Sequence, residues 1–389
     1  MSIPDAQNIE ALRHALPGLA AEALTRAEEF EEDRNISPDF VTKLKAAGVY
    51  RILVAREQGG LGGSLRDWLD MAMTLAEADG STGWTSGHGA VCSALVANIA
   101  QPQFVESVLA DRMSSIAWSN LPKVTVRKEA DGLRIDGRWS FTTGCLSASH
   151  VGGMVAWPDD GTGAPPRHVV ALAPSDEARI ERTWDPIGLA GTGSHDVIFE
   201  NLLVPWMHIF DWPVSKPNSA RPTSVFVPGT WFISMCAAAT HLGLARRALD
   251  EARRELIGKN DRYTGLPILE EQAVLRSLEE AEGLFYACRS GVAAALDAIW
   301  ECGQRGTPVS PELRINARLA CVTAVHQGEH IVRAAYGVAG ASAVRRNGVL
   351  QRLLRDANCL IHHVSSNLKS FDTIGRCRIG LKTVDDVIL

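Results

Sequence analysis

Ile135-Asp-Gly-Arg-Trp-Ser-Phe-Thr-Thr-Gly-Cys145 lies in the middle of the region that decides the fold. The turn pair Asp136-Gly137 falls near its start, and the stretch runs on into two threonines and a glycine, as a hairpin strand that ends in a polar turn would do. Short alternating runs, β-rich runs and Asp/Gly turns continue on both sides, from about residue 114 to residue 217. This pattern predicts a small antiparallel β-domain.

Both flanks of the β-rich zone show the period of helices instead. Before it, apolar residues recur three or four positions apart from Leu12 to Ala27, as an amphipathic helix requires. Ser37-Pro38 and Ser64 are typical helix starts. After the zone, four long segments with few helix-breaking residues predict an antiparallel bundle: about 230–256, 266–302, 309–336 and 346–369.

This order of zones predicts an α+β fold that is mostly α. A chain of 389 residues is long for a single core, so several domains are expected. We expect an N-terminal helical domain over 1–112, a middle antiparallel β-barrel or β-sandwich domain over 113–220, and a C-terminal four-helix bundle over 221–389.

The composition excludes several classes of protein. The chain is 46% hydrophobic, which is enough for a packed core and excludes wholesale disorder. Its net charge of −6, without long basic blocks, argues against a nucleic-acid binder. The uncharged runs 81–105 and 223–240 carry polar residues or Pro-Gly and are not apolar enough to span a membrane. With scattered cysteines and no signal peptide pattern, we expect a soluble, cytoplasmic protein with reduced thiols.

Three local motifs suggest chemistry but fail on context. His326-Gln-Gly-Glu-His330 resembles an inverted zinc-peptidase motif, yet no acidic third ligand follows it, and we expect no metal. Ser194-His195-Asp196 contains three triad residues, but adjacent side chains diverge and cannot form a relay. Gly60-Leu-Gly62 neither follows a strand nor opens a helix, so a dinucleotide-binding motif is excluded.

Four segments in a fixed order are more informative than any single motif. They are the Gly-rich turn over 56–63, the segment 135–145, the turn Trp184-Asp-Pro-Ile-Gly-Leu-Ala-Gly-Thr-Gly-Ser194, and Leu350-Gln-Arg-Leu-Leu-Arg-Asp356. In this order they resemble the acyl-CoA dehydrogenase superfamily over essentially the whole chain. The resemblance implies a flavin cofactor contacted by the β-domain, and assembly as a homotetramer.

The chain departs from the dehydrogenases at the catalytic base. The resemblance implies a glutamate nine residues after Arg355, where this sequence has Val364. A minority of members place the base ten residues before the position of Gly243, where this sequence has Ile233. Neither side chain accepts a proton, so plain dehydrogenation is disfavoured.

His362-His363 follows the same Arg-Asp pair. If one helix continued through this region, Arg355 and His363 would lie within ~80° of each other around its axis, and only one of the two histidines would point into a shared pocket. The pattern resembles the two-component flavin-dependent monooxygenases of this fold, the group D hydroxylases, in which a histidine at the His363 position faces flavin and substrate. A histidine held by neighbouring helices is the structural alternative.

The resemblance implies further residue roles. Thr143 would hold the flavin N5–H, and His363 would deprotonate a phenol or stabilise the C4a adduct. The implied cofactor contacts are Trp118, Ser119, Asn120, Trp139, Thr142, Thr143, Gly144 and, toward a neighbouring subunit's flavin phosphates, Arg262. Core packing explains the presence of Trp139 equally well. For Arg262, the alternative is a surface arginine that contacts no flavin. The candidate substrate contacts are Trp84, His88, Cys92 and His362. Core packing explains Trp84 and Cys92 at least as well.

The expected activity is that of the oxygenase component of a flavin-dependent monooxygenase. It would hydroxylate an aromatic or heteroatom-containing small molecule with O₂ through a C4a-hydroperoxyflavin. The chain has no nicotinamide motif, so reduced FMN or FAD would come from a separate flavin reductase. The alternatives are a flavin dehydrogenase or oxidase with another base, and a non-catalytic flavin-binding relative.

Overall fold

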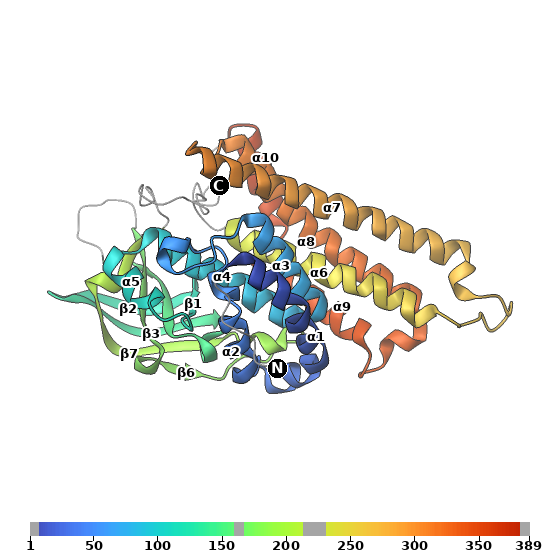
Figure 1. Cartoon of the computed structure of the whole chain (residues 1–389), viewed down its shortest axis with the longest axis horizontal. Helices are drawn as coiled ribbons and strands as arrows, with labels where there is room; N and C mark the ends of the chain where they lie inside the picture. Colours follow the sequence, from blue (N-terminus) through green and yellow to red (C-terminus); the bar gives the residue numbers. More distant parts are fainter. Residues whose placement is uncertain (1–7, 159–166, 213–230, 382–389) are drawn as a thin grey trace.

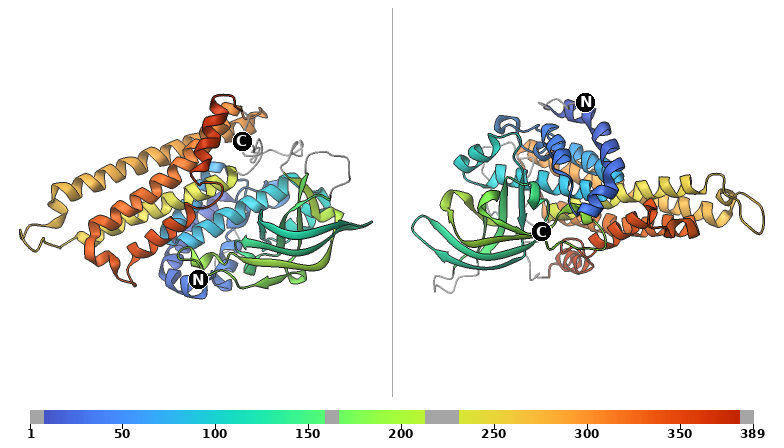
Figure 2. Two further views of the ribbon diagram at one scale, coloured as in Figure 1. Left: turned by 180° about the vertical axis from the view of Figure 1, so that it is seen from behind. Right: turned by 90° about the horizontal axis from the view of Figure 1, so that it is seen from below.

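The computed structural model describes residues 8–158, 167–212 and 231–381, with side chains from Ile233 onward in the last range. The β-strands gather at one end of the molecule, and long helices extend to the other end (Figure 1). The N-terminal helices lie between them, as the two views of Figure 2 also show. The expected boundary at 112/113 falls between the last N-terminal helix and the first strand, and the boundary at 220/221 lies outside the described residues. The domain division stays a prediction.

The N-terminal helices begin where the sequence signals predict. Ser64 and Asp67 form a reciprocal capping box, in which each side chain accepts a backbone N–H of the other residue. Pro38 occupies the first turn of its helix after Ser37. The five helices are α1 (Ile9–Asp33), α2 (Pro38–Ala46), α3 (Leu65–Ala78), α4 (Gly80–Ile99) and α5 (Pro102–Leu109).

Helix α4 is enclosed by the rest of the protein. Every residue from Gly80 to Asn98 is buried, which explains why the run contains no charged side chain. Asp79 caps the helix by accepting the Thr82 N–H over 2.7 Å. Within the described ranges, no helix combines the length and the apolar character that a membrane span requires.

The strands form two four-stranded sheets, with the orders β1-β4-β5-β8 and β2-β3-β7-β6. Trp139, Val197 and Phe199 from one sheet share a core with Val151 and Val169 from the other. The described strands make no pairing between the sheets, so the arrangement is a sandwich and not a closed barrel. The strands are β1 (Ile116–Ser119), β2 (Pro122–Lys128), β3 (Gly132–Thr142), β4 (His150–Ala156), β5 (His168–Pro174), β6 (Arg179–Glu181), β7 (His195–Pro205) and β8 (Ile209–Trp212).

The expectation of an entirely antiparallel β-domain was wrong for one strand. β1 pairs with β4 in parallel, with Ile116 opposite His150 and Ser119 opposite Gly153. All other pairs are antiparallel. β2 and β3 lie between β1 and β4 in the sequence but belong to the other sheet, which leaves β1 able to run alongside β4 in the same direction.

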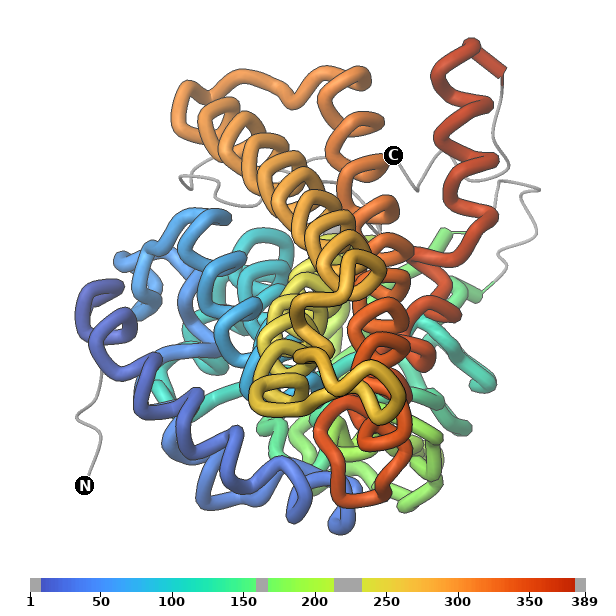
Figure 3. Tube along the Cα trace, turned by 90° about the vertical axis from the view of Figure 1, so that its right-hand side faces the viewer, coloured from blue at the N-terminus to red at the C-terminus, as the bar shows by residue number. Residues whose placement is uncertain are grey.

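The C-terminal helices are α6 (Trp231–Leu256), α7 (Gln272–Arg305), α8 (Pro311–Ala339), α9 (Val349–Leu360) and α10 (Lys369–Arg378). The helix expected over 346–369 is in fact interrupted: α9 ends at Leu360, and turns follow before α10 begins. The ring of His363 accepts the Ser365 N–H, so a polar side chain replaces the helical acceptor there. In Figure 3, which looks along the bundle, α1 and α10 lie on opposite sides.

One hydrophobic core joins the N-terminal helices to the C-terminal bundle. α3 crosses α6 at very short distance, because Gly243 faces Ala76 and an added Cβ at Gly243 would lie 2.6 Å from the Ala76 Cβ. The core also includes Trp118 from β1 and Leu172 from β5. This continuous packing fixes the helices and the sandwich relative to each other around the site described next.

Candidate active site

Four segments that are distant in the sequence meet between the sandwich and the helices. They are the first half of α4, the turn after β3, the turn before β7 and the turn after α9. Of the residues that the sequence analysis selected, the structure brings together Trp84, His88, Cys92, Thr143 and His363.

Thr143 joins these segments through hydrogen bonds. Trp84 donates its indole N–H to Oγ1 of Thr143 over 3.2 Å. Oγ1 of Thr143 lies 2.9 Å from Oγ of Ser194, which lies 2.8 Å from Oγ1 of Thr192. Thr192 donates to the backbone oxygen of Leu189 over 2.9 Å. We call the series of the Thr143, Ser194 and Thr192 hydroxyls, with the Leu189 carbonyl as its last member, the hydroxyl chain.

Backbone contacts hold the two turns that carry the hydroxyl chain. The Gly144 N–H donates to the Thr192 carbonyl over 3.0 Å and so joins the turn after β3 to the turn before β7. Gly144 has a φ of +73°, a conformation that favours glycine. Asp356 of α9 accepts the Leu189 N–H over 2.6 Å, which anchors the second turn to the bundle.

The turn after α9 presents His363, not His362, to the site. The His363 ring meets the Trp84 ring edge-on, with centroids 5.4 Å apart. Trp84 stacks on His88 at 5.7 Å, and Sγ of Cys92 lies 3.7 Å from Nδ1 of His88. The His362 side chain is exposed. The sequence left open which histidine faces the site, and the structure places His363 there.

Arg355 does not share the pocket of His363, contrary to the sequence-based expectation. Its guanidinium pairs with Glu31 and donates to the Ile187 carbonyl over 2.9 Å. The expectation assumed a continuous helix, and α9 ends at Leu360 before it reaches His363.

His363 is a neutral ring with a defined tautomer. Burial, together with the neighbouring His88, lowers the pKa of His363 to about 4. Nδ1 accepts the Ser365 N–H over 3.2 Å and lies 2.8 Å from the Ser365 hydroxyl, which can also donate to it. Because Nδ1 accepts, the hydrogen-bond network assigns the ring proton to Nε2. At neutral pH, His363 is therefore a hydrogen-bond donor through Nε2. This favours stabilising a bound group over deprotonating a phenol.

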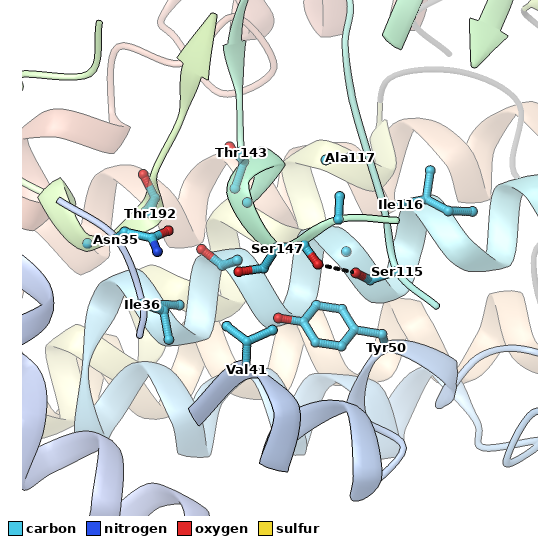
Figure 4. A pocket seen from close by; sticks show the side chains of 15 residues that line it. Asn35, Ile36, Val41, Tyr50, Ser115, Ile116, Ala117, Thr143, Ser147 and Thr192 are labelled. Atoms are coloured by element: carbon cyan, nitrogen blue, oxygen red, sulfur yellow. Dashed lines mark hydrogen bonds between the residues drawn. The ribbon is translucent and has the colours of Figure 1, made fainter. Parts of the chain in front are cut away.

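A cavity that opens to solvent borders the same turn on the side of the N-terminal helices (Figure 4). Thr143 and Thr192 line one wall, and Tyr50 and Val41 line the facing wall. Thr85 also lines the cavity, and its buried hydroxyl has no hydrogen-bond partner among the described residues. The cavity therefore offers polar groups beside the hydroxyl chain.

Two of the predicted cofactor contacts, Ser119 and Asn120, lie where β1 ends. Ser119 donates its hydroxyl to the Ser140 carbonyl over 2.6 Å and accepts the Leu121 N–H over 3.1 Å, so the β-domain backbone already uses it. The side-chain oxygen of Asn120 is buried and has no partner within the described structure. Asn120 is thus the one of the pair with an unused acceptor.

Trp139 lies in the sandwich core and not at the site. Its side chain is 0% exposed, its indole N–H donates to the Met154 carbonyl over 2.8 Å, and its ring packs against Phe199. A ring enclosed on every side cannot also wall a flavin, so this cofactor contact is corrected to the core role that the sequence left open. Thr142, the last residue of β3, is likewise buried.

The remaining two cofactor candidates are Trp118 and Arg262. Trp118 packs against Phe210 and Trp212, with ring centroids 5.8 and 5.7 Å away. Arg262 is exposed in the loop between α6 and α7, at the end of the bundle farthest from the strands (Figure 1). Within one chain it cannot reach the site.

Comparison with known families covers both helical parts of the chain. Residues 7–114 match the family "Acyl-CoA dehydrogenase, N-terminal domain", and residues 235–367 match "Acyl-CoA dehydrogenase, C-terminal domain". The chain belongs to the acyl-CoA dehydrogenase superfamily. The two matches flank the β-domain, as the sequence-based resemblance predicted.

Relatives within this superfamily are named as oxygenases. The chain is 28% identical over 359 residues to an indole-3-acetate monooxygenase of Acinetobacter baumannii, with 92% of this chain and 90% of the relative covered. It is 26% identical over 390 residues to the oxygenase component of an FADH₂-dependent resorcinol hydroxylase of a Rhizobium species, with 94% of this chain and 93% of the relative covered. The crystal structure of the 3-HSA hydroxylase of Rhodococcus sp. RHA1 superposes with a TM-score of 0.87 at 25% identity, over 97% of this chain and 99% of that chain. The predicted resemblance to the monooxygenase branch is confirmed.

The residues around Thr143 fit the flavin of this superfamily. The unpartnered oxygen of Asn120 is an acceptor that an N–H of the flavin's pyrimidine ring would satisfy. The hydroxyl of Thr143 accepts from Trp84 and pairs with Ser194, so one of its three hydrogen-bonding positions stays available to a ligand. Neither position expected for a dehydrogenase base is acidic, since Val364 is exposed and apolar and Ile233 packs against the core.

Sequence reasoning missed three functional candidates. Thr192 and Ser194 were part of the quoted Gly/Thr/Ser turn but received no role, and Asp356 served only as a landmark. Hydroxyl residues beside glycines in a loop were the available signal. Their contact with Thr143 depends on two turns meeting in space, which the sequence does not display.

Proposed function

We propose that this chain is the oxygenase component of a two-component flavin-dependent monooxygenase that acts on an aromatic or heteroatom-containing small molecule. A separate reductase would supply reduced FMN or FAD. The observation that carries the proposal is the neutral His363 placed on Trp84 beside Thr143, with no carboxylate at either expected base position. The relatives named as monooxygenases and as an oxygenase component support it.

The proposed mechanism assigns distinct tasks to the residues of the site. A bound reduced flavin supplies the electrons that activate O₂. Thr143 would hold the N5–H of the flavin, and Asn120 would orient its pyrimidine edge. Trp84 and the buried, uncharged His88 exclude water from the reacting face. His363 donates its Nε2–H toward substrate or oxygen.

We infer an aromatic substrate from the same residues. The edge-on pair of Trp84 and His363 and the stacked His88 offer ring surfaces and one donor. The named relatives act on indole-3-acetate and resorcinol, both of which are aromatic. A phenol or an indole is therefore the first class to test.

Isotope-labelled O₂ provides the decisive test. Protein, reduced FMN or FAD and a panel of phenols and indoles are mixed with labelled O₂, and the products are analysed by mass spectrometry. We expect one labelled oxygen atom in a product and less H₂O₂ when substrate is present. Reduction of bound oxidised flavin by substrate without O₂ would show a dehydrogenase instead. An O₂ consumption that no substrate changes would show a non-catalytic relative.

We further propose a homotetramer in which Arg262 reaches a neighbouring subunit's flavin phosphates, and a cytoplasmic location. The exposed position of Arg262 at the far end of the bundle supports contact with another copy of the chain over contact within its own chain. Its guanidinium is suited to phosphate by its planar set of donors.

A further inference from the structure

We propose that Thr192 and Ser194 are positioning residues that make Thr143 an obligate hydrogen-bond acceptor, so that the site selects reduced over oxidised flavin. The inference rests on the proposed function, since it concerns the flavin that Thr143 would hold. Neither residue touches the flavin in this scheme. Both act through the hydroxyl of Thr143.

The direction of the hydroxyl chain follows from its last member. The Leu189 carbonyl can only accept, so Thr192, 2.9 Å away, must donate its single hydroxyl hydrogen to it. Thr192 then has no hydrogen for Ser194, so Ser194 donates to Thr192 across 2.8 Å. By the same reasoning Thr143 donates to Ser194 across 2.9 Å.

The other end of the hydroxyl chain agrees with this direction. The Trp84 indole nitrogen can only donate, and it donates to Oγ1 of Thr143. The hydroxyl of Thr143 thus gives its hydrogen to Ser194 and one lone pair to Trp84. What remains for a ligand is the second lone pair, which is an acceptor.

The surroundings prevent the hydroxyls from turning. Thr143, Thr192 and Ser194 are 8%, 2% and 4% exposed, so the protein supplies most of their hydrogen-bond partners. Asp356 holds the Leu189 N–H, and the Trp184 indole also donates to the Leu189 carbonyl over 3.1 Å. The terminal acceptor of the hydroxyl chain is therefore fixed from two sides.

An acceptor at this point distinguishes the two redox states of a flavin. N5 carries a hydrogen in the reduced ring and is a bare acceptor in the oxidised ring. A fixed Thr143 lone pair bonds the first and opposes the second, because two acceptors facing each other leave both unsatisfied. Reduced flavin delivered by a reductase is then retained, and oxidised flavin is released.

The test compares Thr192→Val with Thr192→Ser. Valine keeps the shape and removes the hydroxyl, so Ser194 can reverse and Thr143 can turn its hydrogen toward N5. Dissociation constants for reduced and oxidised FMN and FAD are measured separately under anaerobic conditions. We expect the ratio Kd(oxidised)/Kd(reduced) to fall roughly tenfold in Thr192→Val, the effect of about one hydrogen bond, and to stay unchanged in Thr192→Ser. A tenfold fall equals about 30 mV in the potential of the bound two-electron couple.

Ser194→Ala interrupts the hydroxyl chain at a second residue, so the test does not depend on the folding of one variant. It should lower the ratio as Thr192→Val does, and the double variant should lower it no further than the larger single change, because one break already frees Thr143. Equal weakening of both redox forms would show a merely structural role and overturn the inference. An unchanged ratio in both single variants, with a wild type that prefers reduced flavin, overturns the inference alone. A wild type that binds neither form, or binds oxidised flavin as tightly as reduced flavin, overturns the proposed function as well.

Discussion

His362 and His363 are adjacent in the chain but lie in different surroundings. His363 contacts Trp84, whereas His362 is exposed. Replacing His363 with Ala removes the Nε2–H donor, and we expect product formed per reduced flavin to fall roughly tenfold to hundredfold, the usual cost of a buried polar partner. His362→Ala is the matched control and should stay within about twofold. Similar losses in the two variants, measured by product analysis against H₂O₂ formation, would contradict the assigned orientation.

The chemistry of single residues was partly accessible from the sequence. Thr143, Trp84 and His363 could be selected because their residue types and order resemble a family whose site is built from these positions. The tautomer of His363 could not be predicted, because it depends on the Ser365 N–H turning back onto Nδ1. The direction of hydrogen bonding through Thr192 and Ser194 also depends on distances between separate turns.

Among the elements, α9 is joined to the turn before β7 by one buried carboxyl group. Burial raises the pKa of Asp356 to about 7, with Asp79 adding to the rise and the Leu189 N–H opposing it. An unfolded aspartate has a pKa of about 3.9, so between these values the folded state holds a proton that the unfolded state has lost. The contribution of Asp356 to stability is therefore greatest below about pH 4 and falls as the pH rises toward 7.

Asp356→Asn isolates this contribution because the amide stays neutral. The free energy of unfolding, taken as wild type minus variant, should decrease when the pH is raised from about 5 to 8. Urea denaturation of both proteins at the two pH values measures the difference. A difference that does not change with pH, or that grows with pH, would show that the carboxyl is already charged at pH 5.

Gly243 tests the close crossing of α3 and α6, and Gly18 in α1 provides a comparison at an open position. At Gly243 an added Cβ would lie 2.6 Å from both the Ala76 Cβ and the Met73 carbonyl oxygen. Gly243→Ala should therefore destabilise the protein by about 1–3 kcal/mol through overpacking. At Gly18 in α1 nothing lies within 4 Å, so Gly18→Ala should stabilise by up to about 1 kcal/mol through helix propensity. Urea denaturation of both variants gives their free energies of unfolding. A Gly243→Ala variant as stable as the wild type would show that the crossing is looser than the structure indicates.

The sequence predicted elements well where the signal is local and less well where partners are distant. Capping at Ser64 and the long apolar periods of α6, α7 and α8 are local, and these helices lie close to where they were expected. The end of α9 at Leu360 and the parallel pairing of β1 were missed. In the first case a side chain competes with the helix backbone. In the second, a strand pairs with a neighbour that follows it in the sequence only after 30 intervening residues, between Ser119 and His150.

At the scale of the whole molecule, the shared hydrophobic core explains how segments from all three parts of the chain can form one site. α3 and α4 pack on α6 within the same cluster that reaches β1 and β5, so the turns carrying Thr143 and His363 keep their separation. The sequence zones predicted the three parts in order. Their joint core was not predictable, because helical periodicity shows that a face is buried but not which helix covers it.

The assembly of the whole molecule gives the last prediction. If the protein is a homotetramer, sedimentation equilibrium should give a molar mass of about four times the 42.0 kDa of one chain. If Arg262 binds a neighbouring subunit's flavin phosphates, Arg262→Ala should weaken flavin binding roughly tenfold or more while the sedimentation stays unchanged, because a charge-assisted contact is lost and no core is disturbed. Arg305→Ala removes an exposed arginine at the opposite end of α7 and should leave the affinity as it was. Equal affinities in the wild type and Arg262→Ala would confine the flavin contacts to one chain. A monomeric wild type would do the same, since Arg262 lies at the end of the bundle farthest from the strands and cannot reach Thr143 of its own subunit.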